Sequence, residues 1–269
     1  MTEFNDVWYW YDYGHTVIRN ASVQFGEGRI YGLLGLNGAG KSTLLKLASG
    51  LLFPKRGKVL HNGVDVADRR VETLQDIVFM PSEFDLRKES LEKFVKLNSV
   101  FYPRFSREVL DDCLGEFGID PRTRNLEELS LGNRHKFMFG FLLSLGTGLI
   151  LLDEPLNGMD LPSRGMFRKL LMRHLRDDQS VVVSTHVMSD VERIVSDVIV
   201  LRDDGALFCS PLDSISRRYS FGISSSADGA LYCESCAEGY RVLGRNATGA
   251  ESDIPLEILF NAVIKGAIE

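Results

Sequence analysis

The segment that most constrains the fold is a glycine-rich stretch that directly follows a short apolar run. Residues 35–43 read GLNGAGKST, and the five residues before them read IYGLL. The pattern GxxxxGK[ST] is typical of a loop whose backbone N–H groups converge on phosphate oxygens at the start of a helix. A strand before the loop and a helix after it, ending near Gly50, are the context that the pattern needs. A structural glycine-rich turn is the alternative, and this context disfavours it.

The loop residues divide by their chemistry. Lys41 is expected to reach the β- and γ-phosphates of a nucleotide, and the Ser42 hydroxyl is expected to bind Mg²⁺. The other loop residues are expected to surround the phosphates: Gly35, Asn37, Gly38, Ala39, Gly40 and Thr43.

A second apolar run ends in two acids. Residues 149–155 read LILLDEP, which predicts a buried strand whose neighbour in the sheet is the strand that feeds the glycine-rich loop. Asp153 is then placed to hold Mg²⁺, and Glu154 to polarise an attacking water. A strand that simply ends in two solvated acids is the alternative, and the loop beside it makes that reading weaker.

Short apolar runs alternate with helical patterns along most of the chain, which indicates an α/β fold with a mostly parallel buried sheet. Residues 88–140 differ, because Ser90 and Ser106 each precede a helical pattern, and these residues are expected to form a helical insert. After residue 209 the pattern changes again. We expect domains at 1–209 and 210–269, the second a small α+β extension that ends in an amphipathic helix.

Composition excludes several classes of function. The 269-residue chain has a formal net charge of −6 and no long Lys/Arg run, so no nucleic-acid partner is expected. Four cysteines, two of them in a Cys233-x-x-Cys236 pair without further metal ligands nearby, fit a reducing cytosol. No leader pattern opens the chain. The longest apolar stretch, residues 137–152, is shorter than the roughly 20 residues of a spanning helix. A membrane role would therefore need a partner.

Further segments give a resemblance to a known family. Residues 129–133 (LSLGN) resemble the LSGGQ signature of the ABC ATPase family, and residues 157–160 (NGMD) resemble its D-loop. The segment STH at 184–186 resembles the family's switch histidine, and Tyr13-Gly14 resembles the aromatic position that stacks on adenine. The resemblance covers roughly residues 7–209, with the motifs in the family's order.

The resemblance implies a P-loop NTPase fold with a mostly parallel central sheet, an antiparallel β subdomain and the helical insert. It also implies that ATP and Mg²⁺ bind at the interface of two subunits arranged head to tail. Ser130 and Gly132 would contact the γ-phosphate held by the other subunit, and Asp160 would bridge the subunits. Tyr13 would stack on adenine, and His186 would contact the γ-phosphate and hold the attacking water.

Two positions depart from the family pattern. Ser82 stands where the family has a glutamine that binds Mg²⁺, and we expect Glu83 or a water on Ser82 to fill that role. In the signature, Leu131 replaces a glycine and Asn133 replaces the glutamine. A working but slower site is expected.

These features favour an ATP-hydrolysing subunit that powers a separate integral membrane permease, and a second, identical copy is its expected partner. The resemblance to stand-alone subunits of bacterial exporters favours export, from the inner face of the cell membrane. The alternatives are a soluble ABC ATPase that acts on a macromolecule, or an ATP-binding regulatory subunit with little turnover. Residues 210–269 are expected to be either regulatory, dimer-stabilising or structural.

Overall fold

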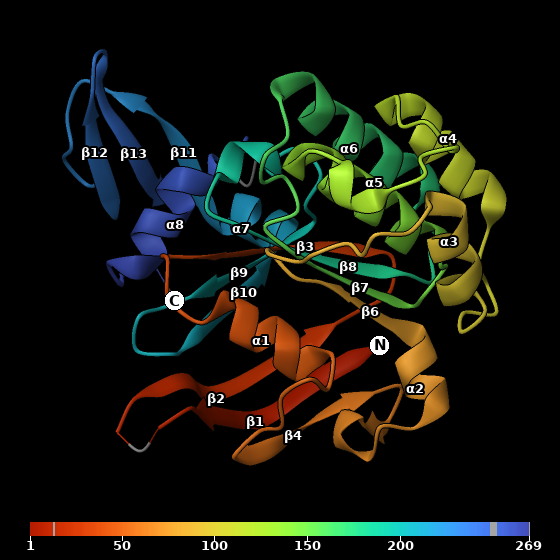
Figure 1. Ribbon diagram of the computed structural model, residues 1–269. Helices are drawn as coiled ribbons and strands as arrows, with labels where there is room; N and C mark the ends of the chain where they lie inside the picture. Colours follow the sequence, from red (N-terminus) through yellow and green to blue (C-terminus); the bar gives the residue numbers. More distant parts are fainter. Residues whose placement is uncertain (13, 248–251, 269) are drawn as a thin grey trace.

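A central six-stranded sheet forms the middle layer of the molecule, which is seen here in a computed structural model that describes residues 1–12, 14–247 and 252–268 (Figure 1). The strand order is β10-β9-β3-β8-β7-β6. Every neighbouring pair is parallel except β10 with β9, so the expected mostly parallel sheet is confirmed. The strands are β3 (Arg29–Gly35), β6 (Ile77–Met80), β7 (Leu149–Asp153), β8 (Ser180–Thr185), β9 (Asp197–Leu201) and β10 (Leu207–Pro211).

One expectation about this sheet is wrong. Strand β7 does not lie beside β3, because β8 is inserted between them. Leu33 of β3 and Asp153 of β7 both pair with Ser184 of β8, from opposite sides. Apolar runs of similar length and composition do not reveal their order in a sheet, so the sequence alone could not place β8.

A second, antiparallel sheet lies below the first, in the order β2-β1-β4-β5. A turn at Asn62-Gly63 joins β4 to β5, and both of its residues have positive φ, as the tightest hairpin turns require. Residues 16–25 form one continuous strand. The strands are β1 (Thr2–Trp10), β2 (Thr16–Phe25), β4 (Arg56–His61) and β5 (Val64–Asp65).

Helix α1 (Lys41–Ala48) lies between the two sheets. Helix η1 (Val66–Asp68) and helix α2 (Val71–Asp76) lead from the antiparallel sheet to β6.

The other face of the central sheet is covered by helices (Figure 1). The two expected caps are confirmed, because the hydroxyls of Ser90 and Ser106 accept hydrogen bonds from the backbone N–H groups of Lys93 and Val109. Among the covering elements are α3 (Leu91–Ser99), α4 (Arg107–Phe117), η2 (Leu126–Glu128), α5 (Leu131–Ser144) and α6 (Leu161–His174).

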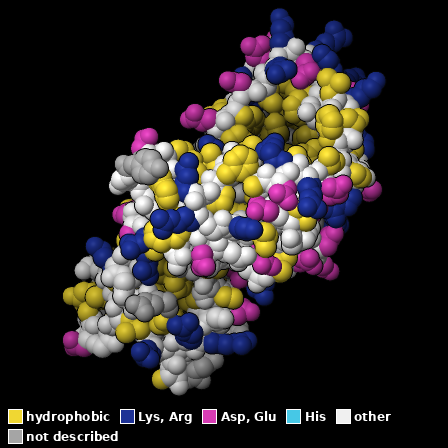
Figure 2. Space-filling model, turned by 90° about the horizontal axis from the view of Figure 1, so that it is seen from below, with side chains coloured by type: hydrophobic (Ala, Val, Ile, Leu, Met, Phe, Trp, Pro, Cys, Tyr) yellow, Lys and Arg dark blue, Asp and Glu magenta, His cyan; other side chains and the backbone are white. Residues whose placement is uncertain are grey.

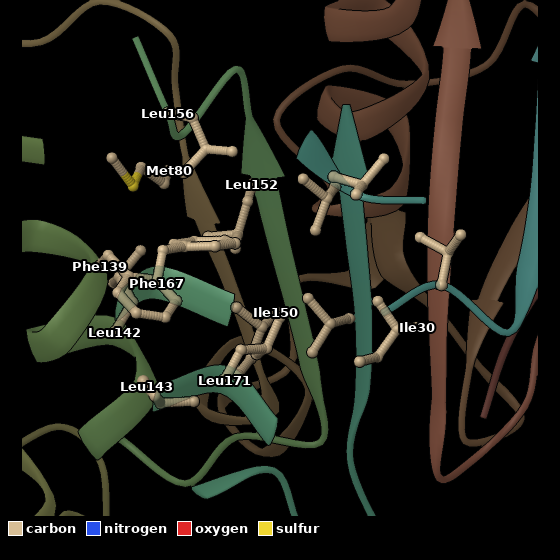
Figure 3. Packing of buried hydrophobic residues seen from close by; sticks show 14 of the residues in the cluster. Ile30, Met80, Phe139, Leu142, Leu143, Ile150, Leu152, Leu156, Phe167 and Leu171 are labelled. Carbon is tan, nitrogen blue, oxygen red and sulfur yellow. The ribbon is translucent and has the colours of Figure 1, made fainter. Parts of the chain in front are cut away.

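The two faces of β7 supply two different apolar cores. Ile150 and Leu152 join the core under the helices, whereas Leu149 and Leu151 join the core around α1. Figure 3 shows Leu152 pointing toward Phe139 of α5 and Phe167 of α6, whose ring centroids are 4.3 Å apart. A strand buried on both faces is fixed in position, so the acids at its end are fixed as well.

The C-terminal part of the chain lies at the side of the molecule away from α3 and α4 (Figure 1). Strand β10 runs through the expected boundary at 209/210, so that division stays a prediction. Cys233 and Cys236 lie three positions apart on one strand and therefore point to opposite faces of its sheet. The elements here are α7 (Leu212–Arg218), β11 (Tyr219–Ser224), β12 (Tyr232–Cys236), β13 (Gly239–Arg245) and α8 (Leu256–Ile264).

Helix α8 buries its apolar residues in the core that lies under the other helices. It packs near η3 (Met188–Asp190), the turn that follows His186. Within the described ranges, no helix is long and apolar enough to cross a bilayer.

Candidate functional site

The glycine-rich loop lies at the carboxyl end of β3 and opens directly into α1. It lines a cavity of about 270 Å³ together with the two acids at the end of β7. The lining residues are Asn37, Gly38, Gly40, Lys41, Ser42, Thr43, Asp153 and Glu154. The structure therefore brings together residues that the sequence analysis assigned to phosphate and to Mg²⁺.

Glycine is required at one position of this loop for two separate reasons. Gly40 has a φ of +109°, which side chains disfavour, and a Cβ there would lie 2.5 Å from Cγ1 of Val17. The loop can pass this close to β2 only as bare backbone. Gly35 ends β3, and Ala39 packs partly against the core around α1.

Lys41 is buried within the loop. Its Nζ donates hydrogen bonds to the carbonyl oxygens of Gly35, at 2.8 Å, and Leu36, at 3.2 Å. Burial lowers the pKa of the Lys41 ammonium, while the carboxylates of Glu154 and Asp153 act in the opposite direction. The ammonium thus has a poorly solvated position, where a polyanion would stabilise its charge.

Asp153 connects the loop helix to the central sheet. Its Oδ2 accepts a hydrogen bond from the Ser42 hydroxyl at 2.6 Å, and its Oδ1 accepts one from the Ser184 hydroxyl at 2.5 Å. The carboxylate is 2% exposed. Asp153 thus links Ser42 at the start of α1 to Ser184 near the end of β8.

Glu154 and His186 are in direct contact, although 32 residues separate them in the chain. Nδ1 of His186 donates to Oε2 of Glu154 at 2.9 Å. Glu154 has a φ of +48°, in a region that residues with a Cβ seldom occupy. Its backbone N–H donates to the Ser184 hydroxyl at 3.0 Å, so the same serine contacts both acids.

A second group of expected site residues lies outside this cavity. The exposed Ser130 caps α5, and its hydroxyl accepts a hydrogen bond from the N–H of Asn133. Gly132 lies so close to the backbone of Gly158 that an added Cβ would overlap the Gly158 carbonyl oxygen. The signature segment and the following loop at 157–160 are thus packed together within one subunit.

Asp160 caps α6 and is exposed. Its Oδ1 accepts from the N–H of Ser163 at 2.8 Å. The hydrogen bonds from Ser163 lower the pKa of the Asp160 carboxyl, which is therefore negatively charged at neutral pH.

Ser82 and Glu83 are expected at the Mg²⁺ site, and Tyr13 is expected beside the adenine. Ser82 and Glu83 follow β6, whose parallel neighbour is β7, but neither lines the cavity beside Asp153. Tyr13 lies outside the described residues. A neighbour of Tyr13 does reach the site, because the Tyr11 hydroxyl lies 3.0 Å from Oγ1 of Thr43.

Comparisons with known proteins agree with this geometry. The family model described as "ABC transporter" matches residues 18–157, which is more than half of the chain. The chain belongs to the ABC transporter ATP-binding protein family. A putative ABC transporter ATP-binding protein of Pyrococcus abyssi is 33% identical over 79% of this chain and 84% of its own length.

Other relatives give the same assignment. The ABC transporter ATP-binding protein YtrB of Bacillus subtilis is 29% identical over 77% of this chain and 70% of its own. A solved structure titled as an ATP-binding subunit of an ABC transporter has a TM-score of 0.72 and 26% identity, with 81% and 92% of the two chains covered. The chain is thus an ATP-binding and ATP-hydrolysing subunit of an ABC transporter.

Sequence reasoning missed two residues of this ABC subunit's site, Ser184 and Tyr11, and one residue that contacts the segment behind it, His135. Ser184 carried a signal, since it is a polar residue that directly follows three valines in a buried strand. Tyr11 follows Trp8, Tyr9 and Trp10, and such a run of aromatic residues is typical of a strand. No pattern in the sequence marks His135, which lies on α5 behind the signature segment.

The close approach of Gly132 to Gly158 gives a prediction on stability. We expect Gly132→Ala to lower the free energy of unfolding by about 1–3 kcal/mol, because the new methyl group overlaps backbone that cannot easily move. Gly115→Ala on α4 is the matched control. It has open space at its Cβ and should raise stability by roughly 0.5–1 kcal/mol. Urea unfolding of both variants measures the difference, and two shifts of the same sign would contradict the packing described here.

Proposed function

We propose that ATP lies with its phosphates on residues 35–43 and that Glu154 and His186 carry out its hydrolysis. The observation that carries this proposal is the 2.9 Å contact between His186 and Glu154 at the rim of the cavity that the loop lines. In this arrangement the backbone N–H groups of the loop and the start of α1 bind phosphate oxygens. Lys41 stabilises charge on the β- and γ-phosphates.

The residues beside the loop fit Mg²⁺. A hydroxyl oxygen of Ser42 and a carboxylate oxygen of Asp153, 2.6 Å apart, are hard oxygen donors of the kind that Mg²⁺ prefers. When bound there, Mg²⁺ would neutralise charge on the phosphates. Ser42 and Asp153 would hold it, and Ser184 would keep Asp153 oriented through its hydrogen bond.

Glu154 is proposed to orient the attacking water and to accept its proton. The hydrogen bond from His186 fixes the direction of the carboxylate, which is 14% exposed. His186 is itself half exposed, so it is free to contact a γ-phosphate as the family resemblance implies.

A second copy of the chain is proposed to complete the site. Ser130, Gly132 and Asp160 lie outside the phosphate cavity, and Ser130 and Asp160 are exposed to solvent. Residues that cannot reach the cavity of their own subunit can still reach that of a partner arranged head to tail. We therefore propose a homodimer in which Ser130 and Gly132 contact the γ-phosphate bound by the other copy.

The proposed hydrolytic role of Glu154 gives a direct prediction. Glu154→Gln keeps the size of the side chain but cannot accept a proton, so we expect kcat to fall by about 10²-fold or more while ATP still binds. Glu192→Gln, an exposed acid near the switch segment, is the control and should keep full turnover. The measurements are phosphate release and binding of a fluorescent ATP analogue. Full turnover by Glu154→Gln would refute the role of Glu154.

The segment after β6 is proposed to supply the remaining contact to Mg²⁺, through Glu83 or through a water on Ser82. Both residues follow a strand that pairs with β7, whose last residue is Asp153. We expect Ser82→Ala or Glu83→Ala to raise the Mg²⁺ concentration needed for half-maximal ATPase activity by at least several-fold. Glu108→Ala, an exposed acid on α4, is the control. If both variants respond to Mg²⁺ like the parent, neither residue has this role.

An integral membrane permease is proposed as the second partner. A cavity beside α3 is lined by residues 85–89 and by part of α3. Next to it Val100 is 71% exposed and Phe101 is 62% exposed. Figure 2 shows a hollow of hydrophobic side chains toward the side on which α3 and α4 lie, with charged side chains around its rim. Exposed apolar surface of this kind favours a protein partner.

This docking proposal also accounts for how ATP turnover reaches the membrane. The cavity beside α3 begins at Asp85, two residues after Glu83, so a partner seated there would touch the segment proposed to contact Mg²⁺. We therefore propose a peripheral position on the cytoplasmic face of the membrane. Export, and a regulatory or dimer-stabilising role for residues 210–269, stay predictions from the sequence.

Co-purification tests whether an integral membrane permease binds this chain. The tagged chain, isolated from detergent-solubilised membranes, is expected to bring with it a protein that has several apolar segments of about 20 residues. Phe101→Ser should abolish this recovery, whereas Met172→Ser, equally exposed on α6, should not. Recovery of a soluble macromolecule in place of a membrane protein would favour the alternative of a non-transport ABC ATPase.

A further inference from the structure

The backbone of Glu154 is held in a strained conformation. Its φ of +48° lies in the left-handed region, and the next residue is Pro155. A left-handed backbone at a residue other than glycine costs about 1–3 kcal/mol, and the ring of a following proline further restricts it. Such a conformation persists only if the neighbouring groups hold it in place.

Backbone hydrogen bonds hold part of this strained segment, since the Glu154 N–H lies 3.2 Å from the Ser184 carbonyl oxygen and the Glu154 carbonyl oxygen accepts from the Asn157 N–H at 3.1 Å. Two side chains add contacts on either side of Glu154. On the amino side, the N–H of Glu154 donates to the hydroxyl of Ser184 at 3.0 Å. On the carboxyl side, the carbonyl oxygen of Pro155 lies 3.3 Å from Nδ1 of His135. A carbonyl oxygen can only accept, so the hydrogen of the neutral imidazole is on Nδ1.

The second ring nitrogen of His135 has no hydrogen-bond partner among the described residues. The side chain is 1% exposed, and this nitrogen, Nε2, is buried with it. Burial also lowers the pKa of the imidazole, which keeps it neutral. Burying an unpartnered polar atom costs stability, and an apolar ring would avoid this cost. The contact with Pro155 is therefore the feature of this site that needs an imidazole.

The same ring also touches the segment proposed to contact Mg²⁺. It stacks on Phe84 with a centroid distance of 5.2 Å and an interplanar angle of 18°. Phe84 directly follows Ser82 and Glu83, and His135 follows the signature segment by two residues on α5. One side chain thus contacts the Glu154 segment and the β6 loop from the helix that begins at the signature.

We propose that His135 is a positioning residue for ATP hydrolysis, which holds the strained Glu154 segment through the Pro155 carbonyl while it supports the loop after β6 through Phe84. The inference rests on the proposed role of Glu154. His135 touches neither the phosphate loop nor its cavity, so it should affect the hydrolytic step and not the binding of ATP.

Two substitutions separate its hydrogen bond from its packing. In His135→Phe the ring remains and can stack on Phe84, but the donor to Pro155 is lost. In His135→Asn the amide nitrogen takes a place close to that of Nδ1 and keeps the donor, while most of the stacking is lost. We expect His135→Phe to lower kcat about tenfold or more with KM for ATP within about twofold of the parent, because a misplaced catalytic group loses rate and not affinity.

His135→Asn should recover kcat to within about threefold of the parent. Hydrogen exchange provides a second readout on the full-length chain, since the backbone amides of residues 156–159 should exchange faster in the Phe variant but not in the Asn variant. Equal losses of kcat in both variants, accompanied by equal losses of thermal stability, would show that His135 only packs and would overturn the inference.

Glu154→Gln, measured beside them, separates this inference from the function on which it rests. If Glu154→Gln loses turnover while His135→Phe turns over at the parent rate, the role of His135 is refuted and that of Glu154 stands. If Glu154→Gln keeps full turnover, the proposed role of Glu154 fails, and that of His135 fails with it.

Discussion

The two hydrogen bonds of the Asp153 carboxylate join the parts of the site on which the rest depends. One oxygen accepts from Ser42 at the start of α1, and the other accepts from Ser184 at the end of β8. A carboxylate buried to this degree is stable only if it is hydrogen-bonded or balanced by positive charge. The two serines meet that need in part, and they also fix the distance between the phosphate loop and the acidic end of β7. Ser184 extends the same network to the N–H of Glu154.

The cores on the two sides of the central sheet give this small network its rigidity. Strand β7 is buried on both faces, and α1 is enclosed between the central and antiparallel sheets. Side chains at the ends of such elements have little freedom to move, which is the condition for positioning a phosphate and a water. The strained backbone of Glu154 depends on the same rigidity. Neighbours with fixed positions hold this conformation, whereas a mobile loop would relax to a lower-energy one.

The expected site residues fall into two groups with different exposure. Lys41, Ser42, Asp153 and Glu154 face one cavity, whereas Ser130 and Asp160 are exposed beyond it. This separation is the physical basis for proposing a head-to-tail dimer. A subunit whose signature cannot reach its own nucleotide is expected to turn over ATP only when a second copy supplies it. His135 connects the loop after β6 with the Glu154 segment, because its ring stacks on Phe84 and its Nδ1 contacts the carbonyl oxygen of Pro155.

The sequence by itself determined the α/β class, the phosphate loop with its helix, the acids after an apolar strand and the caps at Ser90 and Ser106. Each depends on short-range physics: residue spacing along a helix or strand, glycine at a tight turn, or a hydroxyl at a helix start. Tertiary structure decided that β8 separates β3 from β7, that Ser184 bridges both acids, that Tyr11 reaches Thr43 and that His135 lies behind Pro155. Those contacts join residues from 20 to more than 30 positions apart. Strand order and side-chain packing bring them together, and neither leaves a periodic signal in a single sequence.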